Sequence, residues 1–348
     1  MTRRTRVYIT VDVECAEERL VGGRAIPAQG YDLRMWGRFR NQSTDLGVGL
    51  LMRELERHGL RGTFFTEVFG SFSFGRDGLR EVCSAMLERG HDVQLHTHPI
   101  QREARYRSLG KTPAKDDIGA YSTAEQAALL REGVDILVDC GVPREAALGF
   151  RAGNFGANDD TWTAMREAGL SVSSNYNPCY FSRNCKMRAP NAPPHLFEAA
   201  SGVYELPISN FVERGGGHRH LQLTAVSLAE MKDHLRQARR LGIGEITIVT
   251  HSFELCHIDS VEERLGRVNS LNLLRLRGLC SFLAENAGEF EVDTVGALAK
   301  RLATERPPHA GTAVPPMPRG KPWHKARRLV EQAYKRVEIQ LPFSAPVL

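Results

Sequence analysis

The stretch GHDVQLHTHP, residues 90–99, ends an alternating apolar run with two histidines two positions apart. In an extended strand, residues i and i+2 point to the same face, so His96 and His98 are predicted to project together from the strand's C-terminal end. Pro99 cannot donate to the hydrogen-bond ladder and is expected to end the strand. Two converging imidazoles suit a metal ion, and two polar residues at a loop mouth are the alternative.

Strands of this kind alternate with helices along most of the chain. The predicted strands are 6–13, 61–70, 91–98, 147–153, 171–176, 203–209 and 245–251; the predicted helices are 44–60, 78–90, 122–140, 159–169, 227–241, 271–286 and 294–304. This alternation predicts βαβ units, a parallel sheet and an α/β fold. About seven repeats favour closure into a barrel over the alternative, a doubly wound open sheet. The GxGxxG turn typical of many open sheets is absent.

Composition is that of an ordinary globular protein, with 348 residues, a formal net charge of +5 and 42% hydrophobic residues. Both signs of charge are mixed through the body of the chain, so we expect no nucleic-acid partner. The seven cysteines are widely spaced and include no CxxC, which favours a reducing compartment. The N-terminal residues lack the apolar core of a signal peptide, and no apolar run is long enough to span a membrane. We therefore expect a cytoplasmic protein.

The amino-acid composition changes near residue 305. We predict a catalytic barrel over 1–305, a Pro/Gly-rich linker over 306–322, and a basic amphipathic helix and tail over 323–348. The helix could dock on its own barrel, on another subunit, or on an anionic membrane surface. We expect docking on the barrel, and peripheral membrane contact stays open. The sequence predicts no particular oligomeric state.

Chemically active side chains recur where the predicted strands end, which is where barrel enzymes keep their catalytic groups. They are Asp12 and Glu14 in TVDVE, His96 and His98, Arg151 in GFRAG, and His251 in VTH. Two imidazoles and one carboxylate make a three-ligand site with an open position for water, as expected of a catalytic divalent metal. A second carboxylate can act as a general base held by an arginine, and a further histidine can protonate the leaving group. The set describes metal-assisted hydrolysis of an amide or ester.

These segments resemble a known family. TVDVE, GTFFTEVFG, GHDVQLHTHP, GFRAGNFGAND with TWTAMREAG, and TIVTHS follow the order of motifs in the polysaccharide deacetylase (NodB-homology) family, over about residues 6–300. The resemblance implies a distorted (β/α)7 barrel that uses one divalent metal to remove N-acetyl, and in some cases formyl, groups from amino sugars. The DxE and HxHP forms of two motifs make the chain similar to a divergent branch of that family.

Residue roles follow from the resemblance motif by motif. Asp12 matches the family's catalytic base, while Val13 stands where a metal-binding Asp is usual, so Glu14 is expected to be the ligand on the geometric argument above. Arg151 matches the arginine that holds the base, although Ala-Gly-Asn replaces the usual prolines after it. Asp12 and Arg151 are therefore expected to act together.

The histidine motifs match less regularly. His96 matches the first metal histidine, but Ile100 occupies the place of the second, and His98 is the expected substitute. His251 matches the histidine that acts as general acid. The family's tryptophan motif is not visible, and ELPIS (205–209) stands in its place.

The resemblance implies a hydrolase acting on carbon–nitrogen (amide) bonds that removes an N-acyl group, expected to be acetyl, from an amino sugar or sugar conjugate. The expected cofactor is one divalent metal, Zn²⁺ by the ligand set of Glu14, His96 and His98. The substrate could be free, nucleotide-linked or lipid-linked. Two alternatives stay open: a metal-free cyclic amide hydrolase of the same wider family, and a non-catalytic carbohydrate-binding barrel.

Overall fold

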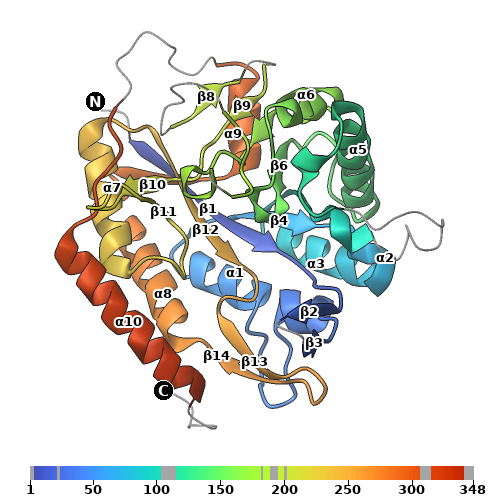
Figure 1. Ribbon diagram of the computed structural model, residues 1–348, viewed down its shortest axis with the longest axis horizontal. Helices are drawn as coiled ribbons and strands as arrows, with labels where there is room; N and C mark the ends of the chain where they lie inside the picture. Colours follow the sequence, from blue (N-terminus) through green and yellow to red (C-terminus); the bar gives the residue numbers. More distant parts are fainter. Residues whose placement is uncertain are drawn as a thin grey trace.

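A curled, mostly parallel sheet forms the centre of the computed structural model, which describes residues 4–21, 24–102, 115–181, 183–188, 195–199, 202–305 and 315–340. The strand order is β12-β1-β4-β5-β6-β7-β9-β8, with β15 also paired to β1 (Figure 1). The strands are β1 (Thr5–Val13), β4 (Thr63–Glu67), β5 (Asp92–Thr97), β6 (Gly149–Ala152), β7 (Val172–Ser173), β8 (Phe197–Glu198), β9 (Tyr204–Glu205), β12 (Glu245–His251) and β15 (Phe290–Asp293). All neighbours in this order are parallel except β8 and β9.

The predicted α/β fold is therefore confirmed, as a half-barrel rather than a regular closed one. Between β9 and β12 no regular ladder is formed in the described part of the chain. Irregular backbone links the two instead: Ile208 N donates to Tyr176 O, and Ser209 N donates to Thr247 O. The barrel is distorted because residues 206–209 continue from β9 without strand geometry.

Helices cover the sheet on its outer face. They are α1 (Val48–Glu56), α2 (Ser71–Phe74), α3 (Arg76–Glu88), α5 (Thr123–Asp139), α6 (Asp160–Glu167), α7 (Leu228–Leu241) and α8 (Ser270–Glu285). Helix α9 (Val295–Leu302) packs instead against inward-facing side chains of the sheet, Tyr8 and Phe65. In Figure 1, α3, α5 and α6 lie on the right of the sheet, α7 and α8 on the left, and α1 between these two groups beside α8. Helices α5 and α7 begin with complete capping boxes, Ser122 with Glu125 and Ser227 with Glu230, in which each side chain bonds the other residue's backbone N–H.

Three short hairpins and the strands β8 and β15 were not predicted. The segment 15–42, for which the sequence predicts no helix or strand and which is therefore expected to be a loop, contains β2 (Arg19–Val21), β3 (Arg24–Ile26) and a π-helical turn at Tyr31–Trp36. The pairs β10 (Asn210–Val212) with β11 (His218–His220) and β13 (Cys256–Ser260) with β14 (Leu265–Val268) are also hairpins. Strands this short are held by backbone pairing outside the main sheet, so their sequences carry no long apolar alternation.

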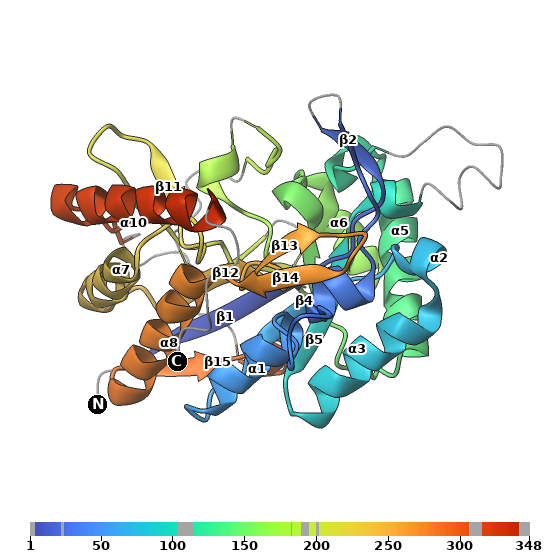
Figure 2. The ribbon, with the colours of Figure 1, turned by 90° about the horizontal axis from the view of Figure 1, so that it is seen from below.

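The C-terminal helix α10 (Pro322–Gln340) lies beside α7 (Figure 2). Arg328 is 2% exposed and donates to Glu230 at 2.8 Å and to Glu213 at 2.5 Å, and Arg275 of α8 donates to Glu331 at 2.7 Å. Parts of the predicted linker and tail, 306–314 and 341–348, lie outside the described residues. Among the described residues, no helix has the length and apolar character needed to cross a membrane.

Candidate active site

The parallel strands end at one edge of the sheet and bring the predicted site residues together. In the ladders Asp12 is the partner of His251, and His96 is the partner of Arg151. Glu14 and His98 follow directly after β1 and β5. Because β12, β1, β4, β5 and β6 are consecutive neighbours, four of the six predicted side chains line one cavity. The other two, His96 and Arg151, are buried in contact with Glu14 and Asp12.

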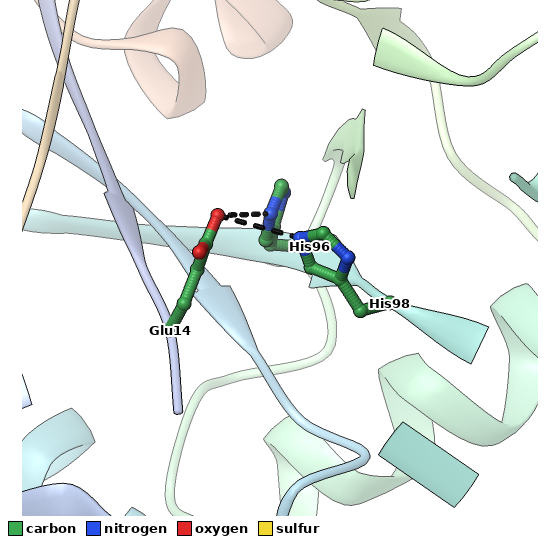
Figure 3. A group of neighbouring side chains, drawn as sticks. All are labelled: Glu14, His96 and His98. Atoms are coloured by element: carbon green, nitrogen blue, oxygen red, sulfur yellow. Dashed lines mark hydrogen bonds and ion pairs between the residues drawn. The ribbon is translucent and has the colours of Figure 1, made fainter. Parts of the chain in front are cut away.

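Three of these side chains converge on one point. Glu14 Oε1 lies 3.2 Å from His96 Nε2 and 3.4 Å from His98 Nε2 (Figure 3). One ligand atom from each of the three residues lies within 4.8 Å of the others. A second such group consists of Asp12, Glu14 and His251, so Glu14 belongs to both.

Hydrogen bonds on the far side of each imidazole indicate what this point binds. His96 Nδ1 is 2.8 Å from the carbonyl oxygen of Arg151, and a carbonyl can only accept, so the proton of a neutral His96 lies on Nδ1. His98 Nδ1 is 3.0 Å from Asp116 Oδ1, which likewise accepts. When both imidazoles are neutral, their Nε2 atoms then present lone pairs to the carboxylate of Glu14. Three facing acceptors are satisfied by a cation between them, so the donor set fits a divalent metal.

The charges around this cluster are strongly coupled. Burial alone would raise the pKa of Glu14, but His98 and His96 outweigh burial and hold that pKa well below its usual range. Burial lowers the pKa of His98, but the carboxylates of Glu14 and Asp116 outweigh burial and raise it well above its usual range, so a metal at this point would displace the proton from His98 Nε2. Glu14 is therefore ionised at neutral pH, as a metal ligand must be.

Asp12 is held by a buried arginine. Arg151 is fully buried, and its Nη1 donates to Asp12 Oδ1 at 2.6 Å. Its other donors are satisfied by Ser174, through the backbone oxygen at 3.2 Å and the side-chain oxygen at 2.9 Å. The guanidinium also lies over the ring of Phe65, 4.2 Å from the centroid. Arg151 therefore fixes one oxygen of Asp12 and leaves Oδ2 turned toward His251 Nε2, 3.9 Å away.

His251 is paired with a carboxylate that the sequence analysis missed. Its Nδ1 lies 2.9 Å from Glu254 Oε1, and Glu254 also accepts from Thr250 Oγ1 at 2.8 Å and from Gln222. Burial lowers the pKa of His251, but Glu254 outweighs burial and raises it to about 9. His251 is therefore protonated at neutral pH, with its Nε2 proton facing the cavity. The spacing of three residues in HSFE was the available signal.

Three further residues at the site, Asp116, Asn154 and Arg34, were also missed. Asp116 accepts from His98 and, at 2.6 Å, from Asn154 Nδ2. Asn154 and the next residue, Phe155, have φ angles of 56° and 54°, a conformation that side chains other than glycine rarely adopt. Arg34 Nη2 lies 3.6 Å from Glu14 Oε2, and its guanidinium stacks on the ring of Phe253 at 3.7 Å.

The cavity above these groups has a volume of about 380 Å³. Asp12, Glu14, His98 and His251 line it, and His96 lies behind them, 1% exposed. Two aromatic side chains in the lining, Phe155 and Tyr180, pack against each other with ring centroids 5.2 Å apart. The cavity therefore has charged and polar side chains on its floor and two aromatic side chains in its wall.

Comparison with known proteins addresses the fold. No protein-family model matches the chain, and no curated protein matches it in sequence. A solved structure from Mycobacterium smegmatis, assigned as a polysaccharide deacetylase, is similar with a TM-score of 0.54 and 17% identity, covering 91% of this chain and 96% of that chain. One from Parabacteroides distasonis, assigned as a glycoside hydrolase/deacetylase, has a TM-score of 0.54 and 10% identity, covering 86% and 71%. The 4-α-glucanotransferase of Thermococcus litoralis has a TM-score of 0.51 and 10% identity, covering 88% of this chain and 41% of that chain.

The chain therefore has the fold of the polysaccharide deacetylases, and the resemblance stated from its motifs is confirmed for the fold. The glucanotransferase shares much of the same architecture, so the fold by itself does not select a reaction. The reaction has to be argued from the side chains at the strand ends.

Proposed function

We propose that this chain is a metal-dependent hydrolase that removes an N-acyl group, most simply acetyl, from an amino sugar. The observation that carries the proposal is the joint arrangement at one cavity: three facing acceptors on Glu14, His96 and His98, beside an arginine-held Asp12 and a protonated His251. Acyl transfer to water needs an electrophile, a base and an acid in reach of one carbonyl. This cavity contains candidates for all three.

Glu14, His96 and His98 are the proposed ligands of one divalent metal, with Zn²⁺ as the expected ion. When bound there, such an ion would polarise the acyl carbonyl and lower the pKa of water. The chain itself orients the ligands, because the Arg151 carbonyl and the Asp116 carboxylate hold both imidazoles by Nδ1.

Asp12 is the proposed general base. Its Oδ1 is occupied by Arg151, and its Oδ2 faces the cavity, so one oxygen can accept a proton from the attacking water. Water oxygen then bonds to the acyl carbon, and Asp12 carries the proton that the water loses.

His251 is the proposed general acid. Its Nε2 lies 3.9 Å from Asp12 Oδ2, so both side chains can reach the same acyl group of a bound substrate. With a pKa of about 9 it is protonated near neutral pH and can give that proton to the departing amine nitrogen as the carbon–nitrogen bond breaks. Water and amide thereby become a carboxylic acid and an amine, with the protons balanced.

The substrate class is inferred from the cavity wall. Phe155 and Tyr180 offer apolar faces beside polar groups, which suits the C–H face of a sugar ring. A free, nucleotide-linked or lipid-linked amino sugar would each place its N-acyl group over the floor. A cytoplasmic location is part of the proposal and is supported by the seven cysteines, all of which are free.

The test is release of acetate from N-acetylated amino sugars by the purified chain, with and without Zn²⁺, beside Asp12→Asn. We expect metal-dependent release that the variant loses by about 100-fold or more. Asp12-dependent opening of a cyclic amide that persists after chelation, without release of acetate from the sugars, would identify the metal-free cyclic amide hydrolase instead. If the chain binds metal but hydrolyses no amide, the non-catalytic carbohydrate-binding barrel is the remaining interpretation.

A further inference from the structure

The C-terminal helix α10 turns a charged face toward the barrel and an apolar face toward solvent. The side of α10 that contacts the barrel is charged, with Arg328 buried against two glutamates and Glu331 against Arg275. The opposite side is apolar and lies in solvent. Four of the seven exposed large apolar side chains of the described residues are on this helix: Trp323 at 64%, Leu329 at 54%, Val330 at 69% and Tyr334 at 57%.

These four residues form one stripe with two exposed alanines between them, Ala326 and Ala333. At 100° per residue, positions 323, 326, 330, 333 and 334 fall on one side of a helix, with 329 at its margin. A soluble helix normally turns such a stripe toward the core. Here ion pairs hold the charged face of α10 against the barrel, so the apolar stripe faces solvent on an anchored helix.

A basic cleft lies directly beside the stripe. Its volume is about 380 Å³, and it separates α7 from α10. Its charged lining consists of Lys232, Asp233, Arg236, Lys321, His324 and Arg327. The single carboxylate in this lining, Asp233, is paired with Lys321 at 2.5 Å, and Arg327 pairs with Glu331.

His324 Nδ1 lies 3.9 Å from Asp233, whereas Lys232 and Arg236 have no carboxylate partner among the described residues. Lys232 and Arg236 lie over the ring of Phe282, at 5.4 Å and 4.9 Å from its centroid. Exposed Lys325 of α10 adds a further positive charge. The cleft therefore has an excess of positive charge, within a few residues of Trp323 at the end of the apolar stripe.

We propose that α10 and the basic cleft together form a surface that binds the anionic headgroup region of a lipid bilayer. The apolar stripe would enter the boundary between headgroups and acyl chains, and the unpaired cations would meet lipid phosphates. A second copy of this chain fits less well. A two-fold contact places each patch opposite itself, so the cations around Arg236 and Lys325 would face their own copies. This inference does not rest on the proposed hydrolase activity.

The experiment is co-sedimentation of the full chain with vesicles of phosphatidylcholine plus phosphatidylglycerol, and with vesicles of phosphatidylcholine alone. We expect binding to the anionic vesicles that weakens as salt is raised, and little to the neutral ones. Arg236→Glu and Val330→Asp should each weaken binding by about fivefold or more. Lys300→Glu, at an exposed position on α9, changes the charge as Arg236→Glu does and should bind as the wild type.

Three results would overturn the proposal. They are no binding of the folded chain to anionic vesicles, an equal loss in Lys300→Glu and Arg236→Glu, and a solution dimer that Val330→Asp turns into a monomer. Size-exclusion chromatography with light scattering decides the last of these. Asp12→Asn should bind vesicles as the wild type does, so a failure of the proposed hydrolase activity and a failure of membrane binding are seen separately.

Discussion

Asp116 offers a direct test of how the proposed ligands are held. The change Asp116→Asn keeps an oxygen that can accept from His98 Nδ1, 3.0 Å away, but removes the negative charge. Loss of a partner that orients a metal-bound histidine costs about 10–100-fold in metal affinity. The Asp116 side chain is 29% exposed, so solvent screens part of its charge. We therefore expect the lower end of this range, about tenfold weaker Zn²⁺ binding, or about 1.4 kcal/mol.

The assay is competition for Zn²⁺ against a chromophoric chelator, with Asp117→Asn as the matched control. Asp117 is the next residue along the chain, but its carboxylate accepts from Asn184 at 3.1 Å and not from His98. The control should bind Zn²⁺ like the wild type. Equal affinities for Asp116→Asn and the wild type would refute the idea that this carboxylate orients a ligand, as would an equal loss in both variants.

Three further predictions concern the acid, the aromatic wall and the C-terminal helix. The charge of Glu254 outweighs burial and raises the pKa of His251 to about 9, and Glu254→Gln removes that charge. Since His251 acts in its protonated form, the alkaline fall of kcat/KM should move about one pH unit or more to lower pH. An unchanged pH profile would contradict this role of Glu254. Tyr180→Ala should raise KM for an amino-sugar substrate more than it lowers kcat, whereas a loss confined to kcat would argue against a binding role. Arg328→Ala should lower the free energy of unfolding in urea by about 3 kcal/mol, because the buried carboxylate of Glu230 loses its arginine partner, while Arg327→Ala, whose side chain is 64% exposed, should change it little.

The strand-end residues could be predicted because local periodicity determines them. Alternation within 91–98 places His96 on the strand's inner side, and the parallel neighbours then require other strand ends to meet it. The same reasoning substituted Glu14 and His98 for the usual ligand positions, and the structure brings both beside His96. Predicting these residues required no knowledge of how distant loops pack.

The residues that hold the site could not be predicted in this way. Asp116 lies 18 positions from His98, and Arg34 reaches Glu14 from a π-helical turn inside a segment expected to be a loop. Their positions depend on how loops pack after the barrel has formed, which sequence periodicity does not describe. The outward apolar face of α10 was missed for a related reason, because amphipathicity alone predicts the opposite orientation.

The central claim is that Glu14, His96 and His98 hold one divalent metal. The most direct test is elemental analysis of the purified protein beside its His98→Ala variant, each after incubation with Zn²⁺ and removal of the excess, with folding checked by circular dichroism. The account predicts about one metal per wild-type chain and a large loss in the folded variant. A wild-type protein that takes up no metal, or a folded variant that keeps it fully, would contradict the account.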